Sequence, residues 1–456
     1  MKKIKDGGQF IIIGGGPTGL GAASRLQELG VIHWTLFEKN SYAGGLSASF
    51  NQNGFVWDIG GHIYFSLYPR YNQLLNEVIP ENDWRIHQRR SFINIGDRWV
   101  PYPFQNNLTF LPMDQRWDCI RGITHLYTKH IKTDDSNFLN LMKTHFGEGI
   151  TNLFLQPYNE KLWAFPLEKL GTDWIKERVA LLDLEQVLFN VINRKKDDSW
   201  GPNNTFSYPL RGGTGIIWRK LAQSLPVEKI KYNSSVKKIS TRKRTITLSS
   251  GETRDYDFII STMPLTELVR MSDQAGLNYY LKHLLHSHLV IIGLALKKPI
   301  PKKVRNFYWM YFPDPGCPFY RATILSNYSP NNAPQDCWSL LLEVSGSSDR
   351  PVQTKKLVDH CLSACLTAGL FRSASDVVDV WKFRTEYDYP TPPTKGRKII
   401  VDRLINRFES YGIYSRGRFG TWKYEIGNMD HSYLQGLEVV DKFLFNQKEI
   451  IYKLNY

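Results

Sequence analysis

The sequence has few cysteines and lacks the features of several protein classes. Its five cysteines are odd in number and include no C-x-x-C pair, which favours free thiols in a reducing cytoplasm over a disulfide framework. Cys361 and Cys365 are one helical turn apart, but no histidine pair stands at zinc-ligand spacing, so we expect buried thiols and no metal. The longest apolar runs, such as Leu289–Leu296, are far too short to cross a membrane. We therefore expect a cytoplasmic protein without a membrane span.

Acidic residues are outnumbered by basic ones. The 43 Asp and Glu residues against 58 Lys and Arg residues give a formal net charge of +15. A nucleic-acid surface, an anionic membrane surface and a site for phosphorylated ligands would each fit this charge. No nucleic-acid-binding motif accompanies the basic clusters at residues 194–196 and 237–244, so we expect no nucleic-acid partner. The charge alone does not choose among the other partners.

The stretch Phe10–Gly19, FIIIGGGPTG, is the most informative in the chain. An apolar β-branched run leads into Gly14, Gly16 and Gly19 at G-x-G-x-x-G spacing. The first glycine permits a tight turn, the second lets a pyrophosphate approach the backbone, and the third lets a helix pack closely on the strand. A second apolar run ends on Glu38, about 20 residues after the last glycine, where a carboxylate can bind a ribose hydroxyl. Together these features predict a dinucleotide site rather than a simple tight turn.

The rest of the chain indicates an α/β protein of two or three domains, because one core rarely serves a chain of this length. Residues 112–195 have helical periodicity, with Asp134, Asp135 and Ser136 as N-cap candidates for one helix and a further helix expected around Trp174. A strand at 255–261 is expected to return the chain to the first sheet. Aromatic and β-branched runs predict a separate, mostly antiparallel sheet from 288–296, 307–312, 322–325 and 338–344. Helices are expected at 357–370, 398–408 and in the tail after 416.

A series of motifs between residues 11 and 443 closely resembles the UDP-galactopyranose mutases of the eukaryotic type. They are, in chain order, DIGGHIYFS, WVPYPFQNN, QPYNEKLWA, IKERVA, WGPNNTF, YPLRGGTG, CPFYRATILSNYSP, YPTP and SRGRFGTWKYEIGNMDHS. The resemblance implies a Rossmann-like FAD-binding domain with an inserted helical domain and an antiparallel-sheet domain. The implied boundaries are 1–86, 205–265 and 410–456 for the FAD-binding domain, 110–204 for the helical substrate domain, and 87–109 with 266–409 for the sheet domain.

The resemblance implies FAD as the cofactor, active in its reduced form, with NAD(P)H as a candidate electron donor. A lone histidine is more often structural, but the resemblance places His62 against the flavin ring. At Met429 the family more often has glutamine, and the contact there is mainly through the backbone. The implied FAD-binding residues are Gly14, Gly16, Thr18, Gly19, Glu38, Gly45, Leu46, Gly61, His62, Val236, Arg418, Gly427, Asn428 and Met429.

The implied catalytic set is His62, Arg178, Arg321 and Asn203, in which the two arginines clamp a substrate diphosphate and Asn203 lies near the sugar. Each arginine alone would be interpreted as a surface residue, yet guanidinium groups pair well with phosphate oxygens. The implied substrate-binding residues are Tyr102, Phe104, Gln105, Phe154, Asn159, Trp163, Arg178, Asn203, Trp309, Tyr311, Arg321, Tyr328, Tyr389, Tyr424 and Asn428.

The resemblance implies interconversion of UDP-galactopyranose and UDP-galactofuranose through a flavin N5–sugar adduct, without net redox change. A mutase for another nucleotide sugar, such as UDP-N-acetylgalactosamine or UDP-arabinose, is one alternative. A flavin oxidoreductase of the amine-oxidase type is a second, and a binding protein resembling the GDP-dissociation inhibitors, without flavin, is a third. The expected partner is a UDP-sugar, and an oligomer is compatible with the sequence.

Overall fold

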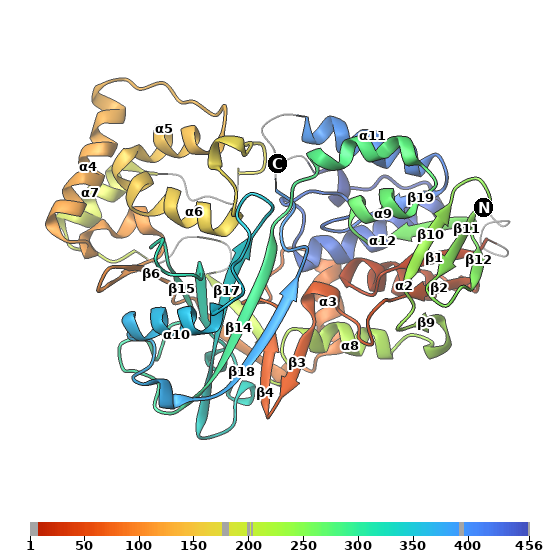
Figure 1. The fold of residues 1–456 in the computed structure, drawn as a ribbon, viewed down its shortest axis with the longest axis horizontal. Coiled ribbons are helices and arrows are strands. Elements are labelled where there is room, and N and C mark those ends of the chain that lie inside the picture. Colours follow the sequence, from red (N-terminus) through yellow and green to blue (C-terminus); the bar gives the residue numbers. More distant parts are fainter. Residues whose placement is uncertain (1–7, 176–181, 198–200, 202–203, 392–395, 455–456) are drawn as a thin grey trace.

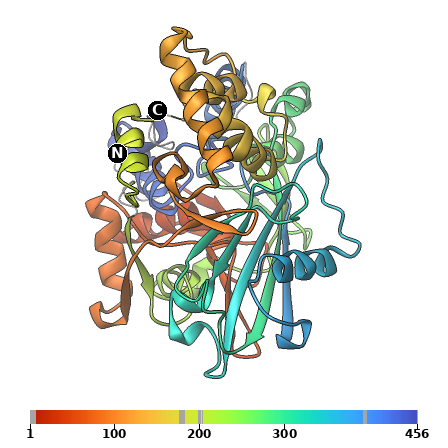
Figure 2. The same cartoon turned by 90° about the vertical axis from the view of Figure 1, so that its left-hand side faces the viewer.

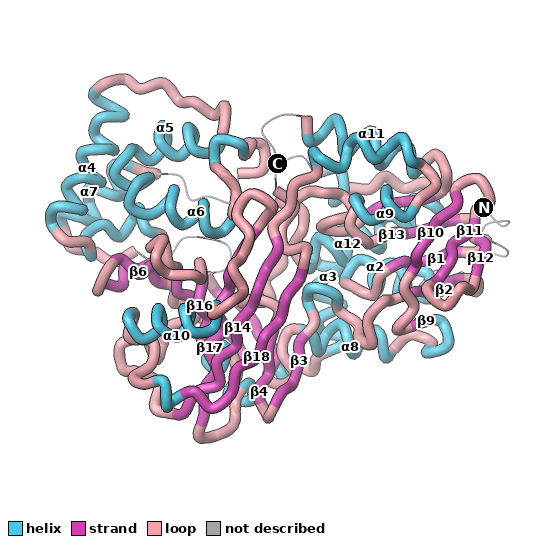
Figure 3. The backbone as a smooth tube through the Cα atoms, in the orientation of Figure 1, coloured by secondary structure: helices cyan, strands magenta, loops and turns pink. Residues whose placement is uncertain are grey.

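The computed structural model describes residues 8–175, 182–197, 201, 204–391 and 396–454. Figure 1 shows three groups of elements: a sheet with helices around the N-terminal strand, a long twisted sheet in the middle, and a group of helices at the opposite end. Figure 3 shows that strands are sparse in that helical group. This arrangement confirms the expected α/β fold class, whereas the exact domain boundaries stay a prediction.

A five-stranded parallel sheet contains the N-terminal strand at its centre. Its order is β19 (Ile413–Ser415), β13 (Phe258–Ser261), β1 (Phe10–Ile13), β2 (Trp34–Phe37) and β9 (Ile230–Lys231). The return of the chain to this sheet is confirmed, because Phe10 pairs with Phe258. The returning strand begins at Phe258 rather than Asp255. Asp255 instead ends β12 (Thr253–Asp255), the edge of a small antiparallel sheet with β10 (Val236–Ser240) and β11 (Thr245–Leu248).

Helices cover both faces of the parallel sheet, as its apolar strands require. Phe10 and Ile12 pack into one core cluster, and Ile11 and Ile13 pack into another on the opposite face. The first cluster lies under α2 (Pro17–Glu28), α3 (Pro69–Val78), α8 (Gly215–Gln223) and α12 (Met429–Phe445). The second lies under α9 (Leu265–Met271), α11 (Arg397–Glu409) and the sheet of β10, β11 and β12.

The middle of the molecule is a seven-stranded sheet, antiparallel except between β15 and β6. Its order is β18 (Val377–Thr385), β14 (His288–Lys297), β17 (Cys337–Gly346), β16 (Arg321–Ile324), β15 (Trp309–Tyr311), β6 (Phe92–Ile95) and β7 (Arg98–Pro101). No strand is predicted from the sequence at β18, an edge strand with exposed charged residues on one face. One face packs on α10 (Leu357–Thr367), where Cys361 and Cys365 are fully buried free thiols, as predicted.

The helical group contains α4 (Met113–Thr128), α5 (Phe138–Ile150), α6 (Gln156–Trp163) and α7 (Leu184–Ile192). Figure 2 shows these helices lying over one end of the seven-stranded sheet. The N-cap of α5 is Asn137, whose side chain accepts the Asn140 N–H at 2.9 Å, so the three predicted N-cap residues are one to three positions too early. The helix expected around Trp174 is wrong for the described part of that segment, because Thr172–Trp174 form a bend and turn, and residues 176–181 lie outside the described residues.

There are also two small antiparallel sheets of two strands each. They are β3 (Ser49–Gln52) with β4 (Phe55–Asp58), and β5 (Trp84–Gln88) with β8 (Thr205–Pro209). In the part of the chain that the structure describes, no helix is both long and apolar enough to span a bilayer.

Candidate active site

The glycine-rich turn after β1 has the geometry that its spacing predicts. Gly14 has φ +104°, and a Cβ there would lie 2.2 Å from the Thr262 Oγ1 atom. A Cβ on Gly19 would lie 1.9 Å from the Gly14 carbonyl oxygen, so α2 can approach the turn only because this residue is glycine. Helix α2 begins at Pro17, and its first N–H groups have no partner within the helix. The turn therefore offers backbone donors to a phosphate.

Glu38 lies at the carboxyl end of β2, beside that turn. One carboxylate oxygen accepts the Gly15 N–H at 2.6 Å, and the other accepts the Asn40 backbone and side-chain N–H groups at 2.8 and 2.7 Å. The side chain is 4% exposed. Oε1 already accepts two hydrogen bonds, whereas Oε2 accepts one and keeps capacity for a further donor, which suits a ribose hydroxyl group.

The remaining predicted contacts of the adenosine half lie around the same turn. A Cβ on Gly45 would lie 3.2 Å from the Cα of Gly16, so two bare backbones face each other. Leu46 and Val236 belong to one apolar cluster, which can contact an adenine ring. Thr18 is buried in α2. These residues fit an adenine dinucleotide.

A cavity of about 730 Å³ lies between the helical group, the seven-stranded sheet and the start of α12. It brings together residues that are far apart in the sequence. The predicted residues that line it are Gly61, His62, Tyr102, Gln105, Phe154, Asn159, Trp163, Trp309, Tyr311, Arg321, Tyr389, Arg418, Tyr424, Asn428 and Met429.

The helical wall of the cavity is aromatic. Phe104 and Phe154 stack with ring centroids 4.9 Å apart, and Phe154 stacks on Tyr158 at 5.4 Å. Phe104 is fully buried behind Phe154 rather than lining the cavity. A π turn, Thr151–Leu155, precedes α6, and such turns are frequent at functional sites because they shift the side chains that follow. The Phe154 ring lines the cavity, and this aromatic wall suits contact with a flat base.

The sheet wall provides a buried cation. The Arg321 guanidinium makes two hydrogen bonds to Glu343, from Nε to Oε1 at 2.7 Å and from Nη2 to Oε2 at 2.6 Å. Glu343 and the surrounding tyrosines raise the pKa of Arg321, although burial acts in the opposite direction as the largest single effect. The tyrosines Tyr102 and Tyr311 pack beside each other at 5.6 Å. This wall can bind an anion.

The third wall is formed by the His62 loop and the segment before α12. Burial, with Arg418 and Arg321 nearby, lowers the pKa of His62 to about 4, so its imidazole is neutral at pH 7. The His62 Nδ1 atom is buried with no hydrogen-bond partner among the described residues. Arg418 Nε donates to the Gly427 carbonyl at 2.9 Å, and α12 begins at Met429. A helix N-terminus and an unpartnered ring nitrogen fit an electron-rich ring such as a flavin.

Besides Phe104, three predicted substrate-site residues are not among those that line the cavity. Tyr328 is fully buried against Tyr208 and Trp309, and its hydroxyl has no partner in the described part of the chain. Arg178 and Asn203 lie outside the described residues. The roles assigned to these residues stay predictions.

Some residues at the cavity are not predicted from the sequence. Tyr158 lines the cavity and lies within the QPYNEKLWA motif, so the motif itself could have indicated it. Arg89 also lines it, with its guanidinium 5.1 Å from the Tyr102 ring centroid. Glu343 is 1% exposed and contacts Arg321 from the neighbouring strand. No local pattern marks Arg89 or Glu343, because their partners are brought to them by the tertiary fold.

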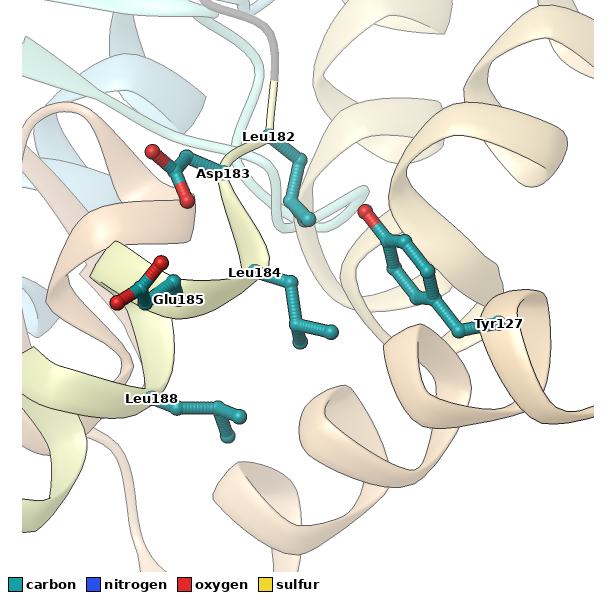
Figure 4. A pocket seen from close by; sticks show the side chains of 6 residues that line it. All are labelled: Tyr127, Leu182, Asp183, Leu184, Glu185 and Leu188. Carbon is teal, nitrogen blue, oxygen red and sulfur yellow. The ribbon is translucent and has the colours of Figure 1, made fainter.

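A second hollow of about 650 Å³ lies between α4 and the start of α7. Figure 4 shows Tyr127, Leu182, Leu184 and Leu188 facing one another, while the carboxylates of Asp183 and Glu185 point away. Asp183 caps α7 by accepting the Gln186 N–H at 3.1 Å. This apolar groove contains none of the predicted residues. Across the described ranges, no three His, Cys, Asp or Glu side chains form a group that could hold a metal ion.

Comparisons with known proteins place these features in a family. The family model of flavin-containing amine oxidoreductases matches residues 17–286. The chain is 40% identical to a protein solved as reduced UDP-galactopyranose mutase, with a TM-score of 0.94 over 98% of this chain and 96% of that one.

More distant structures share the fold alone. A CLA-producing fatty acid isomerase from P. acnes is 15% identical, with a TM-score of 0.65 over 96% of this chain and 99% of that one. Putrescine oxidase bound to putrescine is 14% identical, with a TM-score of 0.62 over the same shares.

Proposed function

Because this chain belongs to the UDP-galactopyranose mutase family, within the flavin-containing amine oxidoreductases, we propose that it interconverts UDP-galactopyranose and UDP-galactofuranose. It is a flavoenzyme of the mutase type with FAD as its cofactor. The observation that carries the choice of substrate is that an aromatic wall, a buried arginine and the His62 loop face one another in the same cavity. These three features match a base, a diphosphate and a sugar held beside a flavin.

In this proposal each wall of the cavity contacts a different part of the substrate or cofactor. Phe154 stacks on the uracil, and Arg321 uses the N–H groups that Glu343 leaves over to bind the diphosphate. Trp163, Tyr389 and Tyr424 close the site against water through contacts between their rings. When bound and reduced, FAD supplies the nucleophile for the anomeric carbon.

His62 acts as a neutral imidazole in this proposal. With its pKa lowered to about 4, it is not in the imidazolium form that acts as a general acid at neutral pH. Its buried Nδ1 atom is a hydrogen-bond partner for the flavin or the sugar. We further place the enzyme in the cytoplasm, since its five free thiols fit a reducing compartment.

A panel of nucleotide sugars tests the substrate. Reduced enzyme is incubated anaerobically with UDP-galactopyranose, UDP-N-acetylgalactosamine and UDP-arabinose, and the products are separated by chromatography. We expect a furanose product from UDP-galactopyranose in the largest yield, and none from an Arg321→Ala control. A larger yield from either other sugar would move the enzyme to a sister activity, and no product from any of the three would refute the proposal.

A further inference from the structure

Glu343 contacts two parts of the site that have different tasks. It lies opposite Arg321 in the antiparallel pair of β16 and β17, with its carboxylate 1% exposed. Both carboxylate oxygens accept guanidinium N–H groups, so the two side chains form a planar pair. Neither the motifs nor the comparisons assign this glutamate a role.

The same carboxylate also borders the loop that precedes His62. Its Oε1 atom accepts the Gly61 N–H through a long hydrogen bond of 3.4 Å. A Cβ on Gly60 would lie 3.3 Å from Oε2 and 3.9 Å from the Arg321 Nη2 atom. The loop therefore lies directly against the ion pair.

The opposite side of the loop is also held. The Gly61 carbonyl accepts the Trp309 Nε1–H at 3.3 Å, and a Cβ on Gly61 would lie 2.6 Å from that nitrogen and 2.8 Å from Thr323 Oγ1. The Thr323 hydroxyl is fully buried, and among the described residues it has no hydrogen-bond partner. The Gly61 residue thus lies between the Glu343 carboxylate, to which it makes a long hydrogen bond, and the Thr323 hydroxyl, which could still form one.

We propose that Glu343 is a positioning residue that couples diphosphate binding at Arg321 to the Gly60–His62 loop. The proposal rests on the proposed function, because the anion at Arg321 is the substrate diphosphate. A phosphate competes with Glu343 for the guanidinium, since both anions are attracted to the same cation. The Glu343 carboxylate can then form a stronger hydrogen bond with the Gly61 N–H. This shifts the Gly60–His62 loop, which lies beside the flavin site. In this way, binding of the nucleotide half of the substrate changes the structure of the loop at the place where the sugar reacts.

A simple counter-ion role makes a different prediction. If Glu343 only neutralised Arg321, its replacement would change the affinity for UDP but not the environment of the flavin once UDP is saturating. The flavin absorbance change at saturating UDP therefore separates the two roles. It is measured on FAD-loaded holoenzyme, with UDP affinity followed by calorimetry.

Glu343→Gln is the principal variant, because glutamine keeps the size but loses the charge that competes for Arg321. We expect UDP to bind within about tenfold of the wild-type affinity, as expected for one altered charged hydrogen bond. We expect the UDP-induced absorbance change at saturation to fall to less than half. Tyr320→Phe is the matched control, since the Tyr320 hydroxyl donates to Oε2 at 2.9 Å and, among the described residues, forms no hydrogen bond with the loop. This control should keep the full change.

A full absorbance change in Glu343→Gln at saturation would overturn the proposal, as would a wild-type enzyme that binds UDP without any change. Glu343→Asp serves if the glutamine variant does not load FAD, because aspartate keeps the charge but is one methylene too short to reach both groups. It should likewise lose most of the change. Failure of the wild type to bind UDP would instead refute the proposed function, so the two failures are distinguishable.

Discussion

Replacing Arg321 with alanine should have two effects that the structure separates. The first concerns the ligand: UDP loses charge-assisted hydrogen bonds worth about 1.5–3 kcal/mol, or roughly 10- to 100-fold in affinity. The second concerns the protein: Glu343, 1% exposed, is left without its cation. Breaking a buried ion pair by removing one partner costs about 3–5 kcal/mol of stability. Both effects follow from one guanidinium that lies between a carboxylate and a cavity.

A second variant distinguishes the two effects. In Arg321→Ala with Glu343→Gln, no buried charge remains, so the denaturation midpoint should recover much of the loss seen in the single variant. UDP affinity should stay as weak as in the single variant, because the diphosphate still lacks its partner. Calorimetry with UDP and urea unfolding of the FAD-loaded proteins measure the two quantities. Unchanged UDP affinity would refute the role of Arg321, and an unchanged midpoint in the single variant would refute the buried ion pair.

Three further results are expected. Phe154→Ala should weaken UDP binding by about 1–3 kcal/mol, the value of base–aromatic stacking, without loss of FAD, and unchanged affinity would place the uracil elsewhere. Heat or acid should release intact FAD, whereas flavin that stays on the peptide would show a covalent bond. Burial raises the pKa of Asp58 to about 6 against the hydrogen bonds that lower it, so the folded state holds this proton more tightly than the unfolded chain. Stability relative to Asp58→Asn should therefore fall by about 2 kcal/mol as the pH rises from about 4 to 6, and a flat difference would contradict this.

The parts of the fold that local patterns determine could be predicted. The strand, glycine turn and helix at residues 10–28 depend on neighbours in sequence, so their pattern is sufficient to place them. The strand β18 was not predicted, because its alternation is clear only from Trp381 to Arg384 and a β-bulge interrupts it between Val377 and Asp379. The α5 cap was misplaced among four consecutive polar residues, since all of them are good caps and only packing selects Asn137.

The site residues also fall into those that motifs predict and those that depend on the tertiary fold. Motif resemblance places Phe154, Trp163 and Arg418 at the cavity that they line. It gives no indication of Glu343, whose importance depends on the register of β16 against β17 and on the approach of a loop from residue 60. The resemblance to the eukaryotic type of mutase and NAD(P)H as the electron donor stay predictions. The same holds for an oligomeric assembly.

The central claim is that the enzyme uses reduced FAD to rearrange a UDP-sugar without net redox change. The most direct test reduces the holoenzyme once with dithionite under anaerobic conditions, adds UDP-galactofuranose and counts the UDP-galactopyranose formed per flavin. Many products per flavin are expected, with none from the oxidised enzyme. One product or fewer per flavin, or equal activity of the oxidised enzyme, would contradict the account.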